Sequence, residues 1–271
     1  MSAAGSTPEQ PAAAGTGGTG GTPTRRDLGV EVLLLLGVSL GASAVWALLE
    51  ITNRLTQNVR LADQQATLNE SATPDRPWLD LAYQLAGVGL GVIPALLAVY
   101  LLHRTHPPAW RTIGLDRRRP GLDLGGGLAL TALIGVPGLG LYLLARALGA
   151  AVDVVPAALG EHWWSVPVLV LAALENSLVE EVIVVGYLLV RLEQFGWPPV
   201  ALVAASALLR GTYHLYQGFG GFLGNVVMGL VFGRVWQRTN RLWPLVLAHF
   251  LIDFVAFVGY AILRGRVSWL P

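Results

Sequence analysis

Seven stretches of this chain are apolar over about 20 residues each, and they restrict the fold to one that is buried in a lipid bilayer. A helix needs about 20 mostly apolar residues to cross about 30 Å of hydrocarbon, because each residue adds about 1.5 Å. The sequence therefore predicts an all-α fold, a polytopic bundle of about seven transmembrane helices, or eight if one short segment escapes this test. The predicted spans are residues 28–51, 79–102, 123–146, 164–190, 198–217, 219–237 and 242–263.

The composition agrees with a membrane protein and excludes several classes of function. Hydrophobic residues make up 54% of the chain and charged residues 13%, whereas a soluble domain has about 25% charged residues. The absence of cysteine excludes disulfides, thiolate metal sites and a thiol protease. All 18 basic residues are arginine, so lysine Schiff-base chemistry is excluded as well. The net charge of +1 indicates that no nucleic acid is a partner.

The chain is predicted to fall into three regions. Residues 1–24 are almost entirely Ala, Gly, Thr, Pro and Ser, which cannot bury enough apolar surface to fold, so we expect a disordered tail. Residues 25–150 hold three spans and a polar segment, 52–78, that we expect to be a loop or a surface helix. Residues 151–271 hold the other four spans. The first apolar stretch is too long for the core of a signal peptide, so we expect it to be retained as a span.

The arginines are distributed unevenly between the two sides of the predicted bundle. With the N-terminus in the cytoplasm, eleven arginines lie inside and six outside, which follows the positive-inside rule. The Arg-only, Ala/Gly-rich composition suggests a GC-rich bacterial source. We therefore expect an integral protein of a bacterial cytoplasmic membrane, surrounded by the lipid bilayer, with a cytoplasmic N-terminus.

Ionisable side chains interrupt three of the predicted spans. Ionised groups cost several kcal/mol in hydrocarbon, so they persist there only when they face a polar interior and serve a function. Counting about 1.5 Å per residue puts them in one slab around the bilayer midplane, where three helices can converge on a polar pocket. Glu175 lies one turn nearer the outer surface and is left outside the predicted site. The predicted site residues are Glu180, Glu181, Arg210, His214, His249 and Asp253.

Helical spacing indicates which of these side chains share a face. Residues four apart lie on the same side of a helix, which pairs Arg210 with His214 and His249 with Asp253. Asn176 and Glu180 form a third such pair. Neighbouring residues differ by about 100° in direction, so the two adjacent glutamates are expected to face different partners. One would face the reaction centre and the other a supporting group.

Two kinds of chemistry suit this set of residues, and the sequence leaves both open. Peptide hydrolysis needs a base for water and hydrogen-bond donors where negative charge develops, and the histidines and carboxylates supply both. Alternatively, His214, His249 and Glu180 could bind Zn²⁺. A single buried histidine is more often structural, but two histidines that converge with carboxylates favour a functional site.

Three ordered motifs resemble those of a known family. Glu180-Glu181-Val-Ile-Val-Val-Gly186, Ser206 to His214, and His249-Phe-Leu-Ile-Asp253 are similar to the motifs E-E-x-x-x-R, F-x-x-x-H and H-x-x-x-N/D. These belong to the CAAX protease and bacteriocin-processing (CPBP) intramembrane proteases. The family includes type II CAAX prenyl endopeptidases and lysostaphin resistance protein A-like proteins. The resemblance covers about residues 164–263.

The resemblance implies an intramembrane endopeptidase, either a metalloprotease or a glutamate-dependent enzyme. Glu180 and His214 would activate a water molecule, while His249 and Asp253 would stabilise the oxyanion or complete the polar site. Glu181 would support them. The substrate would be a membrane-associated peptide or protein, lipidated or not. Prenylated CAAX proteins are the eukaryotic substrates, but they are not expected in a bacterium.

Two positions depart from the family motifs. The motif arginine falls at Val185, and the motif phenylalanine falls at Arg210. One positive charge is thus lost from one span and gained in the next, so we hypothesise that Arg210 replaces the missing guanidinium as ion-pair partner of Glu181 or Glu180. The alternatives are a catalytically inactive immunity or scaffold protein with the CPBP fold, and a proton-coupled transporter, which also needs intramembrane Glu, His and Asp.

Overall fold

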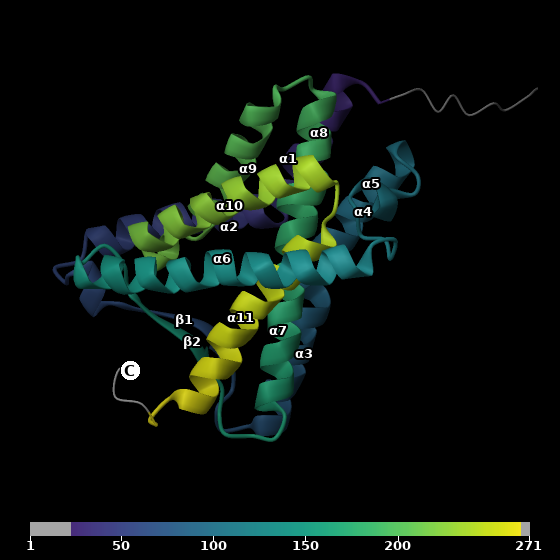
Figure 1. Cartoon of the computed structure of the whole chain (residues 1–271). Helices are drawn as coiled ribbons and strands as arrows, with labels where there is room; N and C mark the ends of the chain where they lie inside the picture. Colours follow the sequence, from purple (N-terminus) through teal and green to yellow (C-terminus); the bar gives the residue numbers. More distant parts are fainter. Residues whose placement is uncertain (1–22, 267–271) are drawn as a thin grey trace, which may run out of the picture.

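The structure is a computed structural model that describes residues 23–266. Residues 1–22, which form most of the predicted tail, and residues 267–271 lie outside the described residues (Figure 1).

The described chain is mainly helical, which confirms the prediction of an all-α membrane protein, with one short parallel strand pair added. In order, the elements are α1 (Arg25–Gly37), α2 (Leu40–Leu55), the 3₁₀ turn η1 (Leu61–Asp63), β1 (Gln65–Glu70), α3 (Pro77–Gly91), α4 (Ile93–Thr105), α5 (Ala109–Thr112), α6 (Pro120–Ala147), β2 (Asp153–Ala158), α7 (Ser165–Glu180), the π-helical segment η2 (Glu181–Tyr187), α8 (Leu188–Gln194), α9 (Pro199–Tyr213), the 3₁₀ turn η3 (Leu215–Gln217), α10 (Phe219–Thr239) and α11 (Trp243–Leu263).

Four helical stretches within residues 23–266 are long and apolar enough to cross a membrane, so the predicted count of seven spans is not confirmed. A fifth is possible if α1 and α2, which bend by 54° at their junction, form one broken span. The predicted spans 164–190 and 198–217 are not among these stretches. Helix α9 has only 15 residues, against about 20 needed. The continuous helix formed by α7, η2 and α8 is long enough, but it carries several charged residues, among them Glu180 and Glu181. The four stretches are Pro77–Thr105, Pro120–Ala147, Phe219–Thr239 and Trp243–Leu263.

The polar segment 52–78 contains β1, where the sequence predicted a loop or a surface helix. Its residues alternate between polar and apolar side chains, Gln65-Ala-Thr-Leu-Asn-Glu70, which suits a half-buried strand. The strand pairs in parallel with β2, and Gln65 lies opposite Asp153. The pairing ties the segment after α2 to the segment before α7 (Figure 1).

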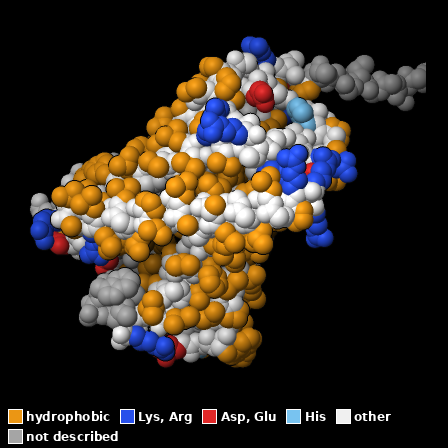
Figure 2. All heavy atoms as spheres, viewed as in Figure 1, with side chains coloured by type: hydrophobic (Ala, Val, Ile, Leu, Met, Phe, Trp, Pro, Cys, Tyr) orange, Lys and Arg blue, Asp and Glu red, His pale blue; other side chains and the backbone are white. Residues whose placement is uncertain are grey.

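The helix α7 and its continuation through η2 and α8 run through the middle of the bundle (Figure 1). Helix α11 packs against α6 and α7, and α10 packs against α9. All seven residues of η2 are buried, and its valines and isoleucine belong to the main hydrophobic core. Hydrophobic side chains also cover much of the outer face in Figure 2, as the surface of an integral membrane protein requires.

Candidate active site

The two glutamates lie at the junction between α7 and η2. Glu180 is the last residue of the α-helix, and Glu181 is the first residue of the π-helical segment. Four consecutive β-branched residues, 182–185, follow them, and such residues lose side-chain freedom in a regular α-helix. π-helical turns of this kind occur frequently at functional sites.

Arg210, near the end of α9, joins the two glutamates. Its Nη2 donates to Oε1 of Glu181 at 2.7 Å, and its Nη1 lies 3.4 Å from Oε2 of Glu180. The side chains of Glu180 and Glu181 were expected to face different partners. The guanidinium of Arg210 instead contacts both of them. Because neither Arg210 nor Glu181 is exposed to solvent, each charge needs the other for compensation.

The carboxylate of Glu180 is held on one side and open on the other. Tyr213 donates its hydroxyl hydrogen to Oε2 at 2.7 Å, the same oxygen that faces Arg210. The second oxygen, Oε1, faces Nε2 of His214 at 3.9 Å. This distance is too long for a direct hydrogen bond.

The end of α9 sets the orientation of His214. The helix ends at Tyr213, so the main-chain carbonyl of Arg210 is among the last four, which have no regular partner within the helix. Nδ1 of His214 binds this carbonyl at 2.9 Å. Since a carbonyl oxygen only accepts, Nδ1 carries the hydrogen, and Nε2 is the nitrogen that faces Glu180.

His249 of α11 lies between two carboxylates. Its Nδ1 is 2.8 Å from Oε1 of Glu181, and its Nε2 is 3.6 Å from Oδ2 of Asp253, one turn further along α11. Asn176 of α7 approaches the same aspartate oxygen at 3.5 Å. The six predicted site residues thus form one continuous series of contacts from His214 to Asp253.

The comparison with protein families identifies the segment that carries these contacts. Residues 162–255 match the family described as type II CAAX prenyl endopeptidase Rce1-like. This segment is an Rce1-like domain of the CPBP family. It contains all six site residues, so the resemblance seen in the three motifs is confirmed. No curated protein and no solved structure matches the chain.

The Rce1-like domain and the apolar helices together establish the class of protein. The chain is an integral membrane protein that carries a domain of a CAAX-type intramembrane protease family. Members of a protease family act on peptides or proteins, which is the substrate class expected from the motifs.

The site also contains two residues that the sequence did not single out. Tyr213 lies within the motif from Ser206 to His214, but the motif did not predict its hydrogen bond to Glu180. A signal existed, because a tyrosine inside an apolar span must find a partner for its hydroxyl group. Asn176 was paired by spacing with Glu180, but its amide approaches Asp253 instead.

Other polar groups of the same helices make contacts outside the six predicted site residues. Glu175 packs against Gly91 of α3, where an added Cβ would lie 2.3 Å from its Oε1. Tyr187 and Arg191 both bind Glu31 of α1, at 2.8 Å in each case. Glu175 therefore packs toward α3, and its exclusion from the site remains a prediction.

The Rce1-like domain does not present a ready metal site. Zinc takes three or four protein ligands at about 2.0–2.2 Å from nitrogen and oxygen. Among the residues that the structure describes, no three His, Cys, Asp or Glu side chains are arranged to hold a metal ion. The candidates Glu180, His214 and His249 are therefore not gathered as a ready set of metal ligands in the described structure.

Proposed function

We propose that this protein is an intramembrane endopeptidase in which Glu180 activates the attacking water. The observation that supports this is the asymmetry of the Glu180 carboxylate. Oε2 is fixed by Tyr213 and Arg210, while Oε1 has only His214 opposite it within residues 23–266, at 3.9 Å. A water molecule that hydrogen-bonds to both groups suits this spacing.

In the proposed reaction, Oε1 of Glu180 takes a proton from the water as its oxygen attacks the carbonyl carbon of the scissile bond. Nε2 of His214, whose other nitrogen is held by the Arg210 carbonyl, accepts the second hydrogen bond of the water. When the tetrahedral intermediate collapses, the C–N bond breaks and Glu180 returns its proton to the leaving amine. Atoms and charges balance without a further reactant.

His249 is the proposed donor to the oxyanion, in the doubly protonated imidazolium form in which both ring nitrogens carry a hydrogen. Glu181 holds its Nδ1 at 2.8 Å, which fixes the ring and leaves Nε2 as the nitrogen on the side of Asp253. A donor that is fixed before the reaction costs no reorganisation when negative charge develops. Asp253 orients the ring from the other side and completes the polar site.

Arg210 is a positioning residue in this scheme, because its contacts are with Glu180 and Glu181 and not with a reacting atom. We further propose that it replaces the motif arginine whose position is Val185. Val185 is fully buried in the hydrophobic core, and the guanidinium comes from α9 instead. The missing motif arginine also favours one alternative, a catalytically inactive scaffold or immunity protein with this fold.

The substrate is proposed to be a membrane-associated or lipidated peptide or protein in a bacterial cytoplasmic membrane, with the N-terminus of the protease in the cytoplasm. The proposed division places the catalytic region at 151–271 and a supporting region at 25–150. The test is cleavage of a randomised peptide library by the protein in lipid vesicles, with products read by mass spectrometry. Wild-type protein should cleave and Glu180→Ala and His214→Ala should not. Absence of cleavage by the wild-type protein would favour the inactive alternative.

A further inference from the structure

One edge of strand β1 is open, and the alternation of its peptide groups shows which residue faces outward. The N–H of Asp153 donates to the carbonyl of Gln64 at 2.9 Å. Peptide groups in a parallel pair point alternately toward the partner and away from it. Ala66 therefore faces β2, while Gln65 and Thr67 direct their peptide groups away from it.

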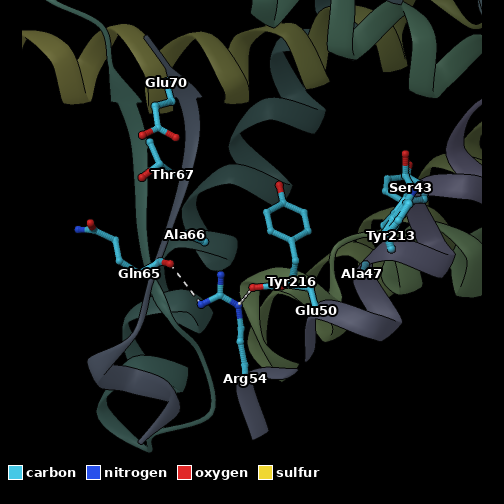
Figure 3. Close-up of a pocket in the computed structure, with 11 residues that line it drawn as sticks. Ser43, Ala47, Glu50, Arg54, Gln65, Ala66, Thr67, Glu70, Tyr213 and Tyr216 are labelled. Atoms are coloured by element: carbon cyan, nitrogen blue, oxygen red, sulfur yellow. Dashed lines mark hydrogen bonds and ion pairs between the residues drawn. The ribbon is translucent and has the colours of Figure 1, made fainter. Parts of the chain in front are cut away.

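The outward groups of Thr67 have no hydrogen-bond partner among residues 23–266. The neighbouring outward carbonyl, that of Gln65, already accepts from Nη1 of Arg54 at 3.2 Å, as Figure 3 shows. An unpaired strand edge is a ready template for an extended peptide, which adds to the sheet through main-chain hydrogen bonds.

This edge forms one side of a groove. The cavity has a volume of about 540 Å³, within the range of ligand pockets, and lies between β1 and α2 (Figure 3). Ser43 and Ala47 of α2 line the side opposite Thr67. The groove is therefore bounded by a free strand edge on one side and by α2 on the other, where Trp46, Glu50 and Arg54 also line it.

The groove shares a wall with the candidate active site. Tyr213 and Tyr216 both line it. Tyr213 donates its hydroxyl hydrogen to Glu180 at 2.7 Å, and the ring of Tyr216 stacks near that of His214, with 6.4 Å between the ring centres. A chain lying along β1 would therefore lie next to two residues that contact the carboxylate and the imidazole of the candidate site.

The charges in the groove favour one kind of chain. Glu50 is paired with Arg54 at 2.9 Å. Glu70, at the end of β1, is exposed and forms no ion pair among the described residues. The groove therefore offers one uncompensated carboxylate, which complements a basic side chain.

We infer that the substrate polypeptide binds in this groove as a strand added to β1, with its main chain paired to Thr67 and a basic side chain facing Glu70. That the bound chain is then cleaved rests on the proposed function. That it binds as a strand added to β1 does not depend on cleavage.

A matched pair of variants at one position tests the main-chain pairing. Thr67→Pro removes the outward N–H but leaves the groups that pair with β2, whereas Thr67→Ala changes only the side chain. Loss of one main-chain hydrogen bond corresponds to about a fivefold change in KM. Thr67→Pro should raise KM by about this factor or more with little change in kcat, and Thr67→Ala, which keeps the N–H, should raise KM less.

Two further experiments, a modified peptide and a Glu70 variant, test the inference without placing proline in β1. A peptide that the protein cleaves should bind wild-type protein more weakly once the amide that pairs with Thr67 is N-methylated. Glu70→Gln should remove a preference for Arg or Lys at one position of the cleaved library peptides. Equal KM values for Thr67→Pro and Thr67→Ala, or cleaved peptides without any basic preference, would overturn the inference.

The failure of this inference can be separated from the failure of the proposed function. Binding of a fluorescent peptide library to the Glu180→Gln protein needs no cleavage. If the wild-type protein cleaves nothing, the proposed function fails. Library binding that Thr67→Pro weakens more than Thr67→Ala does would then still support the groove. Binding that neither variant changes, or no binding, would overturn it.

Discussion

Arg210 and Glu181 form an ion pair of 2.7 Å in which neither side chain is exposed to solvent. The pair connects α9 to the start of η2, and the same guanidinium lies 3.4 Å from Glu180. Because the two carboxylates are adjacent in sequence, a single cation between them allows both to remain close together. The geometry of the candidate site therefore depends on Arg210.

Removing that cation should destabilise the fold. Arg210→Ala leaves buried carboxylates without compensation, and breaking a buried pair in this way costs about 3–5 kcal/mol. The melting temperature of the purified protein measures the effect. Arg238→Ala, which removes an exposed arginine at the end of α10, is the control and should melt like the wild type.

The proposed exchange of arginine positions predicts a rescue. Arg210→Phe should lower yield and activity, because it restores the motif residue of α9 without supplying a cation. Adding Val185→Arg should recover both, since the guanidinium then comes from η2. Yield, melting temperature and peptide cleavage of the single and double variants check this. A double variant no better than Arg210→Phe would contradict the exchange.

Tyr213→Phe should reduce kcat while leaving the protein folded. It removes the hydroxyl that binds Oε2 of Glu180 at 2.7 Å, and a hydrogen bond to a charged group contributes about 1.5–3 kcal/mol, or about 10- to 150-fold in rate if it is needed in the transition state. Tyr142→Phe is the matched control, because its hydroxyl binds the N–H of Val154 away from the site. Equal kcat values for the two variants would show that Tyr213 does not position Glu180.

The loop between α5 and α6 should make the protein sensitive to acid. Arg241 donates to Asp116 at 2.5 Å, and this bond lowers the pKa of Asp116 below its ordinary value. A carboxyl whose folded pKa is depressed stabilises the fold above its unfolded pKa of about 3.9, and this stabilisation is lost as the pH falls through the folded pKa.

Melting temperatures measured from about pH 6 down to about pH 2 test this assignment. Arg241→Ala should lower the melting temperature near neutral pH and flatten its decline in acid. Arg118→Ala, which removes the exposed partner of the same aspartate, should have a small effect. An acid decline that persists unchanged in Arg241→Ala would assign the sensitivity to other carboxylates.

Much of the candidate site could be predicted from the sequence because ionisable residues inside apolar spans must gather. Glu180, Arg210 and His249 stand out against hydrocarbon-like surroundings, and spacing alone paired His249 with Asp253. The roles assigned to these residues and the division into regions remain predictions.

Other features depend on information that local patterns lack. The pairing of β1 with β2 joins segments more than 80 residues apart, so only the folded chain reveals it. The bend between α1 and α2, the π-helical segment and the short length of α9 result from packing that hydropathy does not report. The count of spans was therefore less predictable than the site within them.

The central claim is that the carboxylate of Glu180 activates water. Single-turnover cleavage by Glu180→Gln, compared with Glu175→Gln on the same helix, tests it most directly. Loss of a general base lowers the rate by about 10²- to 10⁴-fold, so Glu180→Gln should fall by this factor while Glu175→Gln stays near the wild type. A Glu180→Gln protein that cleaves as fast as Glu175→Gln would contradict the claim.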